Sequence, residues 1–336
     1  MLNLKKVAAE YPNTPESIDA VATARLIYVD NGKVDEYANW VKTLGFVTVT
    51  DDELENDTYN SAEKQYLQGN SKAAQDGFVS YNAKFANGKY ALKSNFYLAQ
   101  LYFADNLEKN AIPNYEYVVA KSRNEFTEQS LVRLAGIFIK SNDSKTLSIL
   151  KRLESEADFP QNITYAQANL MKIYYEQKDY PNAVIYSDKV LANPKTDNKI
   201  KSDAQIIVAR SAIKSNDFDK AKSAYAKLQT IAKGELAAEA LFYDAFFKNR
   251  ESKFELSNKA VNILSKDFSG YKYFGAKGLV VMAKNFYGLK DSYQATYILN
   301  AVLENFKEYA DVQDEAQKEL DLIKTEEAKT NSSIIK

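Results

Sequence analysis

The chain has 336 residues, with 44 Lys and Arg against 45 Asp and Glu, and it contains neither cysteine nor histidine. The composition therefore excludes a disulfide framework, a zinc finger, an iron–sulfur cluster, a cysteine nucleophile, a His-based catalytic triad and a His-ligated haem. The balanced charge argues against a general nucleic-acid-binding protein, which usually carries a basic excess.

Glycine and proline are scarce, with 11 and 6 residues in the whole chain. Because these residues interrupt helices and populate tight turns, their scarcity favours long helices over a turn-rich β protein. No run of about 18 apolar residues occurs, so we expect no direct membrane insertion. Residues 1–10 lack the apolar core and cleavage site of a signal peptide and are typical of an amphipathic helix, so we expect Met1 to begin a fragment of a longer chain.

In chain order, residues 1–15 are predicted to be the remnant of a preceding repeat. Residues 16–307 are predicted to form eight helical hairpins, near 16–45, 58–87, 91–122, 127–157, 162–193, 198–230, 235–266 and 272–306. Residues 46–57 form an insertion after the first hairpin, with a β-prone first half and an acidic second half. A polar capping helix is predicted over 308–329, followed by a frayed tail over 330–336.

The hairpins are identified by a short phrase in which a polar turn precedes a small residue that opens a second helix. The phrase occurs at 69–74, 178–183, 216–221 and 290–295. When the small residue is taken as the anchor, the equivalent positions in the eight hairpins are Glu36, Ala74, Ala111, Leu147, Ala183, Ala221, Glu255 and Ala295. Five of the eight are alanine, which predicts a repeated structural role.

A second column of small residues lies twelve positions earlier, in the first helix of each hairpin. Its members are Ala24, Ala62, Ala99, Ala135, Met171, Ala209, Tyr243 and Ala283. Two antiparallel helices approach to about 8 Å only where side chains are small, so alanine in both columns predicts close helix packing. Three residues further on, five of eight residues are aromatic, and we expect them to fill the wedge between neighbouring hairpins.

The pattern small–x–x–aromatic, followed by alanine nine residues later at a period near 34, resembles the tetratricopeptide repeat (TPR) family over residues 15–307. The sequence departs from the family pattern at five positions, Glu36, Leu147, Met171, Tyr243 and Glu255. The stretches 95–102 and 113–129 are similar to the C-terminal arrays of long TPR proteins of the Bacteroidetes cell envelope. The linker phrase at 10–13 is similar to that of outer-membrane assembly TPR lipoproteins.

The resemblance implies an all-α, right-handed superhelix, or solenoid, of about eight TPR-like hairpins with a C-terminal capping helix. It also implies that the first helix of each hairpin lines a concave groove. The column after the first-helix alanines is rich in basic residues and should face this groove, where it would suit an acidic or carboxylate-bearing peptide. The residues predicted to bind a partner are Arg25, Tyr97, Gln100, Arg133, Lys172, Arg210 and Lys284. The alternatives are a solvated face of mixed charge and, for the aromatic residues, packing between repeats.

No motif favours a catalytic residue, a metal site or a cofactor. The acidic segment 51–57 lacks the spacing of a calcium-binding EF-hand, which favours a solvated loop. The glycines between 270 and 278 match no phosphate-binding motif. Paired carboxylates would permit glycoside hydrolysis, but the single tryptophan, Trp40, is placed in helix packing rather than in a sugar platform. We therefore predict that the protein is not an enzyme.

The expected function is a non-catalytic protein–protein interaction scaffold, which binds a protein or peptide partner in its groove or docks a partner on a face, without nucleic acid. The resemblance implies a periplasmic protein in a cell-envelope assembly, whereas the lack of cysteine is equally compatible with the cytosol. Two alternatives stay open. One is a structural spacer of a larger protein with no ligand of its own, and the other is a helical-toroid glycoside hydrolase.

Overall fold

The computed structural model describes residues 1–334, with side chains described up to residue 329. This part of the chain contains eighteen α-helices and no β-strand. The helices divide into two compact units, Met1–Ile163 and Thr164–Lys336, and the division falls inside the tenth helix. The predicted all-α fold is therefore confirmed, and each unit is described by itself. The last two residues of the predicted tail, 335–336, lie outside the described residues.

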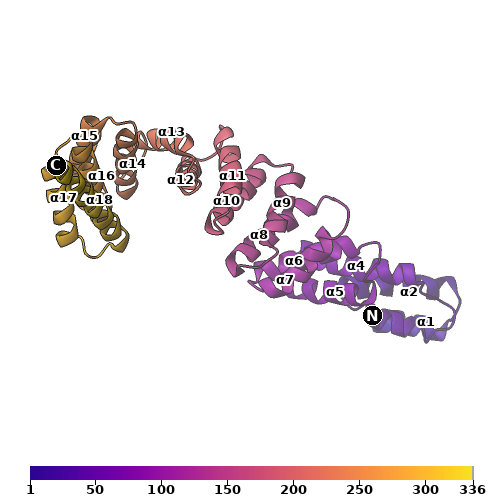
Figure 1. Cartoon of the computed structure of the whole chain (residues 1–336). Helices are drawn as coiled ribbons and strands as arrows, with labels where there is room; N and C mark the ends of the chain where they lie inside the picture. The colour runs from indigo at the N-terminus through magenta and orange to yellow at the C-terminus, as the bar shows by residue number, and fades with distance from the viewer. Residues whose placement is uncertain (335–336) are drawn as a thin grey trace. The chain divides into compact units, whose positions relative to one another are not determined.

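The first unit is a row of helical hairpins in which each helix packs against the next one along the chain (Figure 1). Its helices are α1 (Leu2–Glu10), α2 (Pro15–Asp30), α3 (Val34–Val41), α4 (Asp51–Leu67), α5 (Ser71–Lys84), α6 (Ala91–Ala104), α7 (Glu108–Val119), α8 (Thr127–Ser141) and α9 (Thr146–Glu156). Hairpins 1 to 4 are α2/α3, α4/α5, α6/α7 and α8/α9. Helix α1 packs on α2 through its buried residue Ala8.

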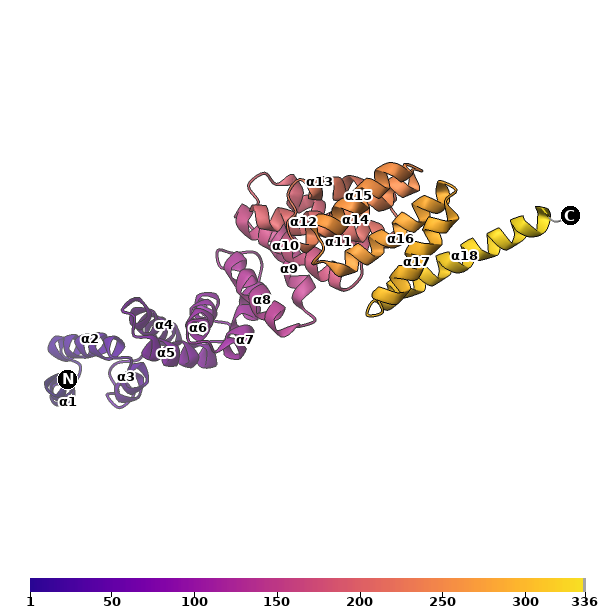
Figure 2. The same cartoon turned by 90° about the vertical axis from the view of Figure 1, so that its left-hand side faces the viewer.

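The second unit continues this arrangement with four further hairpins, α10/α11, α12/α13, α14/α15 and α16/α17. Its helices are α10 (Pro160–Glu176), α11 (Tyr180–Ala192), α12 (Asn198–Lys214), α13 (Phe218–Gln229), α14 (Glu235–Arg250), α15 (Phe254–Asp267), α16 (Lys272–Gly288), α17 (Ser292–Asn305) and α18 (Ala310–Ile334). Helix α18 packs against α16 and α17, and its later turns extend beyond both (Figure 2). No helix within residues 1–334 carries an apolar stretch long enough to cross a membrane.

Small residues occupy the buried interface between the two helices of most hairpins, and in the first helices seven of the eight residues at this position are alanine. In the first helices this position is held by Ala24, Ala62, Ala99, Ala135, Met171, Ala209, Ala245 and Ala283, each 0% or 1% exposed. Helices α4 and α5 approach closely, since a Cβ atom added to Gly77 would lie 2.7 Å from the Cβ atom of Ala62. The predicted role of the alanines, which is to let adjacent helices touch, is confirmed.

Hairpin 7 differs from the predicted register by two residues. Its two small positions are Ala245 and Ser257, both fully buried, and the Ser257 hydroxyl donates a hydrogen bond to the Ala245 carbonyl at 2.7 Å. The predicted equivalents Tyr243 and Glu255 are therefore wrong. The spacing of twelve residues is kept, but the residue three positions after Ala245 is Lys248, so the wedge residue here is not aromatic.

Hairpins 1 and 4 also differ from the predicted register in their second helices. Val34 and Thr146 hold the buried positions there, whereas Glu36 is exposed and Leu147 is half-buried. The connection between the two helices has three residues in hairpin 1, as in most hairpins, and four residues in hairpin 4, so its length does not explain the difference. The buried position follows the buried alanine of the first helix by ten residues in hairpin 1 (Ala24 to Val34) and by eleven in hairpin 4 (Ala135 to Thr146), so a fixed spacing of twelve residues fails.

Each hairpin turn contains one residue with a left-handed backbone conformation, and this conformation explains the recurring phrase. The residues, whose φ lies between 51° and 76°, are Gly32, Gly69, Asn106, Asn142, Lys178, Asn216, Ser252 and Lys290. In four hairpins the next residue is an aspartate, and in three of these, at Asp179, Asp217 and Asp291, the aspartate is the N-cap of the second helix. Its side chain accepts a hydrogen bond from the backbone N–H three residues later, at 3.3, 3.1 and 3.0 Å. The phrase thus encodes the end of one helix and the N-cap of the next.

Lys290→Gly is expected to raise the free energy of unfolding by about 1 kcal/mol. Lys290 has a left-handed backbone conformation, which strains a residue with a Cβ atom by about this amount, whereas glycine adopts it with little strain. Gly69→Ala is the reverse change at the equivalent turn. No atom lies within 4 Å of the added Cβ, so only backbone strain acts, and a loss of about 1 kcal/mol is expected. Urea unfolding followed by circular dichroism measures both. Changes of the same sign in the two variants would contradict this explanation.

The acidic segment 51–57 is the start of α4 and not the second half of an insertion, so that prediction is wrong. The Thr50 hydroxyl accepts a hydrogen bond from the Glu53 N–H at 3.2 Å, and the Glu53 carboxylate accepts one from the Thr50 N–H at 3.0 Å. This reciprocal cap starts the helix, and acidic side chains in a first turn are favoured by the helix dipole. The β-prone residues 47–50 precede the helix without forming a strand.

Candidate binding surface

Four of the predicted groove cations form ion pairs that link consecutive hairpins. Arg25 pairs with Asp57, Lys172 with Asp203, Arg210 with Glu239 and Lys284 with Glu315, at N–O distances of 2.6, 3.0, 2.6 and 2.8 Å. In each case the cation lies late in one first helix and the carboxylate lies early in the helix that follows the hairpin. For Lys284 that helix is α18, which takes the place of a further first helix. These pairs therefore stabilise the junctions between hairpins.

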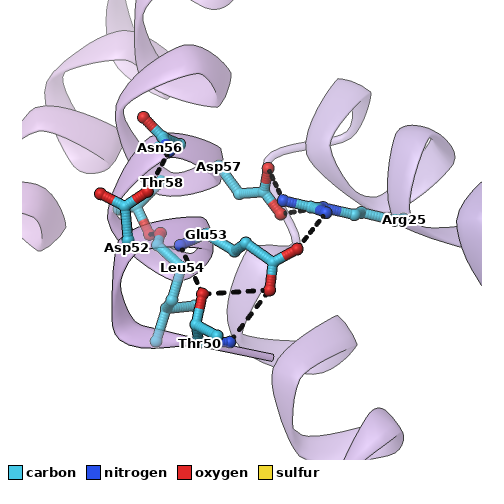
Figure 3. A network of polar contacts seen from close by, with 8 residues as sticks. All are labelled: Arg25, Thr50, Asp52, Glu53, Leu54, Asn56, Asp57 and Thr58. Carbon is cyan, nitrogen blue, oxygen red and sulfur yellow. Dashed lines mark hydrogen bonds and ion pairs between the residues drawn. The ribbon is translucent and has the colours of Figure 1, made fainter. Parts of the chain in front are cut away.

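Figure 3 shows the junction between hairpins 1 and 2. Nε and Nη2 of Arg25 donate to the two carboxylate oxygens of Asp57, at 2.6 and 3.1 Å, and Nη1 donates to Glu53 at 3.0 Å. The hydrogen bond to Asp57 raises the pKa of Arg25. The Thr50 N–H lowers the pKa of the Glu53 carboxyl. Since all three nitrogens of the guanidinium are engaged within the chain, Arg25 offers little to a partner.

Tyr97 and Gln100 also contact their own unit. The ring of Tyr97 is stacked on that of Tyr66 with 4.7 Å between centroids, which is packing between consecutive first helices. The side-chain oxygen of Gln100 accepts a hydrogen bond from the Tyr115 hydroxyl at 3.0 Å. Both residues stay partly exposed. Their predicted role in binding stays a prediction.

Arg133 lines a cavity of about 460 Å³ at the end of the first unit, together with Arg123, Glu128 and Phe159. Its guanidinium carbon lies 4.3 Å from the centroid of the Phe103 ring, a cation–π contact. The buried Nε atom has no hydrogen-bond partner within the described part of the chain. The opposite wall is fixed by Glu128, whose carboxylate accepts the N–H groups of residues 158 and 159 at 3.0 and 3.1 Å.

The second unit carries a cavity of about 200 Å³ built by four consecutive first helices, α10, α12, α14 and α16. We call it the aromatic–basic cavity. Its lining residues are Tyr175, Arg210, Ile213, Lys214, Glu239, Phe242, Tyr243, Tyr273, Phe274 and Lys277. Three of these side chains are cationic, one is anionic and five are aromatic. Of the seven predicted binding residues, the structure places only Arg210 in this cavity.

A buried carboxylate fixes the position of Arg210. Glu239 is 4% exposed, and its two oxygens accept hydrogen bonds from Nε and Nη2 of Arg210, at 2.9 and 2.6 Å. The hydroxyl of Tyr225 donates to the same carboxylate at 2.7 Å. The bond to Glu239 raises the pKa of Arg210, so the guanidinium is charged at every physiological pH. Within the described part of the chain no hydrogen bond uses the Nη1 atom of Arg210.

The other two cations of the cavity differ in their surroundings. Lys277 is half-buried, with its ammonium 5.6 Å from the Phe242 ring centroid and 5.4 Å from that of Tyr273. Its nearest carboxylate is Asp311, at 3.5 Å. Lys214 is exposed at the end of α12, and no ion pair involves it within the described residues.

Tyr243 and Tyr273 of the cavity stay protonated at neutral pH. Burial raises the pKa of Tyr243, and burial followed by a hydrogen bond to Asp311 raises the pKa of Tyr273 to about 12. The cavity thus presents hydroxyl groups, aromatic rings and permanent positive charge, an arrangement suited to recognition. No group of three or more acidic side chains that could hold a metal ion occurs among the described residues.

Sequence reasoning missed Lys214, Lys277 and the aromatic lining of the cavity. Lys214 lies one turn after Arg210 on the same helix face, and this spacing of four residues was a usable signal. Lys277 lies on α16 and reaches the cavity only through the packing of α14 against α16. Its proximity to Arg210, 67 positions earlier in the chain, has no local sequence signal.

Comparison with known proteins finds no family model and no curated protein sequence that matches this chain. The solved structures similar to it include the following three. A tetratricopeptide repeat protein from Parabacteroides merdae shares 13% identity over 80% of this chain and 98% of its own, with a TM-score of 0.38. The TPR domain of P58(IPK) shares 13% identity over 92% and 99%, with a TM-score of 0.31. The C-terminal part of a TPR repeat-containing protein from Cytophaga hutchinsonii shares 14% identity over 87% and 98%, with a TM-score of 0.33.

All three solved structures are described as TPR proteins. The assignment of the fold itself rests on the packing in this chain. Paired antiparallel helices recur at about 37 residues, with a buried residue at the same place in each first helix, which is alanine in seven of the eight. The chain is an all-α tandem array of TPR-like helical hairpins.

Proposed function

We propose that this chain is a non-catalytic scaffold that binds a segment of a partner protein at the aromatic–basic cavity, and that it works within a cell-envelope assembly. One observation carries the proposal. Elsewhere in the predicted groove column, the cations Arg25, Lys172 and Lys284 are paired with carboxylates of the next helix. At the cavity, by contrast, Lys214 and an edge of Arg210 have no such partner and lie beside partly exposed aromatic rings. Aromatic side chains and arginine are the residue types that dominate binding energy at protein interfaces.

The double variant Lys214→Glu with Lys277→Glu is expected to reduce partner recovery at least tenfold in in-cell crosslinking followed by mass spectrometry. Each reversal replaces an attraction by a repulsion at the cavity, and charge complementarity governs association. The matched control is Lys259→Glu with Lys266→Glu, which makes the same charge change on exposed residues of α15. Equal recovery with the two double variants would contradict the proposal.

The support for the envelope setting is the sequence resemblance to envelope TPR proteins, and this part of the proposal needs its own test. We expect the native protein to be digested by protease added to cells after the outer membrane is permeabilised, while a cytosolic marker survives. Protection equal to that of the marker would remove the envelope part of the proposal and leave the scaffold part.

A structural spacer without a ligand is the second candidate, and the ion pairs between hairpins favour it, because they hold neighbouring hairpins in register. For a spacer, neither double variant would change what is crosslinked. A glycoside hydrolase gains no support from the cavity. Such an enzyme uses two carboxyl groups, whereas the cavity contains only Glu239, which is already bound by Arg210.

A further inference from the structure

We infer that the ligand of the aromatic–basic cavity is an acidic peptide segment in which a carboxylate side chain lies next to an aromatic one. This inference rests on the proposed function and adds the chemistry of the partner. The argument uses three properties of the cavity, which are its size, its charge and its apolar floor.

The size of the cavity limits the ligand. At about 200 Å³ it is smaller than the roughly 300–1,000 Å³ of sites that enclose cofactors or drug-sized molecules. A space of this size holds one or two side chains. The rest of a bound segment would therefore lie outside, along the exposed ends of the first helices.

The charge of the cavity selects for carboxylate. Its lining carries three cations and one anion, and the anion, Glu239, is buried and already accepts three hydrogen bonds. Of the surrounding carboxylates, Asp311 lies 3.5 Å from Lys277, and Asp244 is paired with Lys248 at 2.6 Å. An incoming carboxylate would thus meet Lys214 and the Nη1 atom of Arg210. It would accept a hydrogen bond from Nη1, the one guanidinium nitrogen of Arg210 that Glu239 does not bind.

The apolar floor selects for an aromatic ring beside that carboxylate. Phe242 and Phe274 have ring centroids 6.1 Å apart, and Tyr273 meets Phe274 edge to face at 5.2 Å. Lys277 lies over two of these rings, so the floor is both apolar and close to positive charge. A ligand ring would add a further offset or edge contact to this cluster, a geometry that aromatic side chains prefer.

Single-stranded nucleic acid also combines negative charge with rings that stack, but the surroundings disfavour it. A phosphate backbone requires a continuous basic track. In the second unit, Lys172 of α10 and Lys284 of α16 lie outside the cavity lining, and they are paired with Asp203 and with Glu315 and Glu319, respectively. The positive charge that these contacts leave unpaired therefore lies at the cavity, which suits a short acidic motif better than a long phosphate backbone.

The test is fluorescence anisotropy of the full chain with a fluorescein-labelled peptide of alternating glutamate and phenylalanine. We expect saturable binding that weakens between about 50 and 200 mM salt. We also expect about tenfold weaker binding when glutamine replaces glutamate in the peptide, and again when alanine replaces phenylalanine. Lys214→Glu with Lys277→Glu should weaken binding about tenfold or more, whereas Lys259→Glu with Lys266→Glu should leave it within about twofold. Circular dichroism checks that each variant is folded.

Three results would overturn the inference. They are no saturable binding by the unaltered protein, equal affinity for the glutamate and glutamine peptides, and tighter binding of a labelled oligothymidine than of the acidic peptide at about 150 mM salt. If the crosslinked partner still depends on Lys214 and Lys277 while the acidic peptide does not bind, the scaffold function stands and the ligand chemistry is wrong. If neither depends on these lysines, both proposals fail.

Discussion

Arg210→Ala is expected to lower the free energy of unfolding by about 3 kcal/mol. The substitution leaves the carboxylate of Glu239, 4% exposed, with only the Tyr225 hydroxyl as a donor. Removing one partner of a buried pair costs about 3–5 kcal/mol, because an uncompensated charge stays behind. We take the lower end of this range, because the Arg210 side chain is 43% exposed and water can replace part of its hydrogen bonding to Glu239.

Urea unfolding measured together with hydrogen exchange of α12 and α14 provides the test of this prediction. Lys214→Ala is the control, since it removes an exposed cation from the same helix and should cost less than about 0.5 kcal/mol. Adding Glu239→Gln to Arg210→Ala should recover at least about 1 kcal/mol, because the neutral amide carries a much smaller desolvation penalty. A loss no greater than that of the lysine control would show that Glu239 is already satisfied without Arg210.

Gly77→Ala is expected to destabilise the protein by about 1–3 kcal/mol, although alanine is the better helix former by about 1 kcal/mol. The added Cβ would lie 2.7 Å from the Cβ atom and 3.1 Å from the Cα atom of Ala62 on the facing helix. The second of these is a backbone atom, so relief requires that α4 and α5 move apart.

Gly275→Ala is the matched control for this substitution. It is also a helical glycine, in α16, but no atom lies within 4 Å of the new Cβ, so the change should stabilise by up to about 1 kcal/mol. Thermal unfolding of both variants gives the comparison. Ala62→Gly combined with Gly77→Ala should restore part of the lost stability, because it removes the Cβ atom of residue 62, with which the new Cβ atom of residue 77 clashes. If Gly77→Ala raised the melting temperature as much as Gly275→Ala, the close helix contact would not exist.

Most of the fold could be predicted from the sequence because it depends on local spacing. The alanine columns, the hairpin turns and the all-α architecture all follow from residues that lie within one repeat of each other. The register of hairpin 7 could not be predicted, because Ala245 and Ala238 are both small and buried on the same helix. Only the packing of α15, through Ser257, selects one of them.

The binding surface could be predicted only in part. The sequence identifies the column of basic residues but not which of them are free, since an ion pair such as Arg210 with Glu239 joins residues 29 positions apart. Whether such a pair forms depends on how one hairpin is rotated against the next. The same rotation brings Lys277 to the cavity, and it is set by core contacts such as Phe242 with Phe274, which no short motif describes.

The ion pairs between hairpins have a consequence for the exchange of repeats. The pairs at the different junctions are chemically distinct. Arg25 forms a fork with Asp57 and Glu53, Lys172 makes a single contact with Asp203, and Arg210 grips one buried carboxylate. A permuted protein, in which two of these hairpins trade places, would therefore replace the matched pairs by pairs of different geometry and burial. The hairpins are therefore not interchangeable modules, because each of these ion pairs fits the two hairpins that are neighbours in the native order.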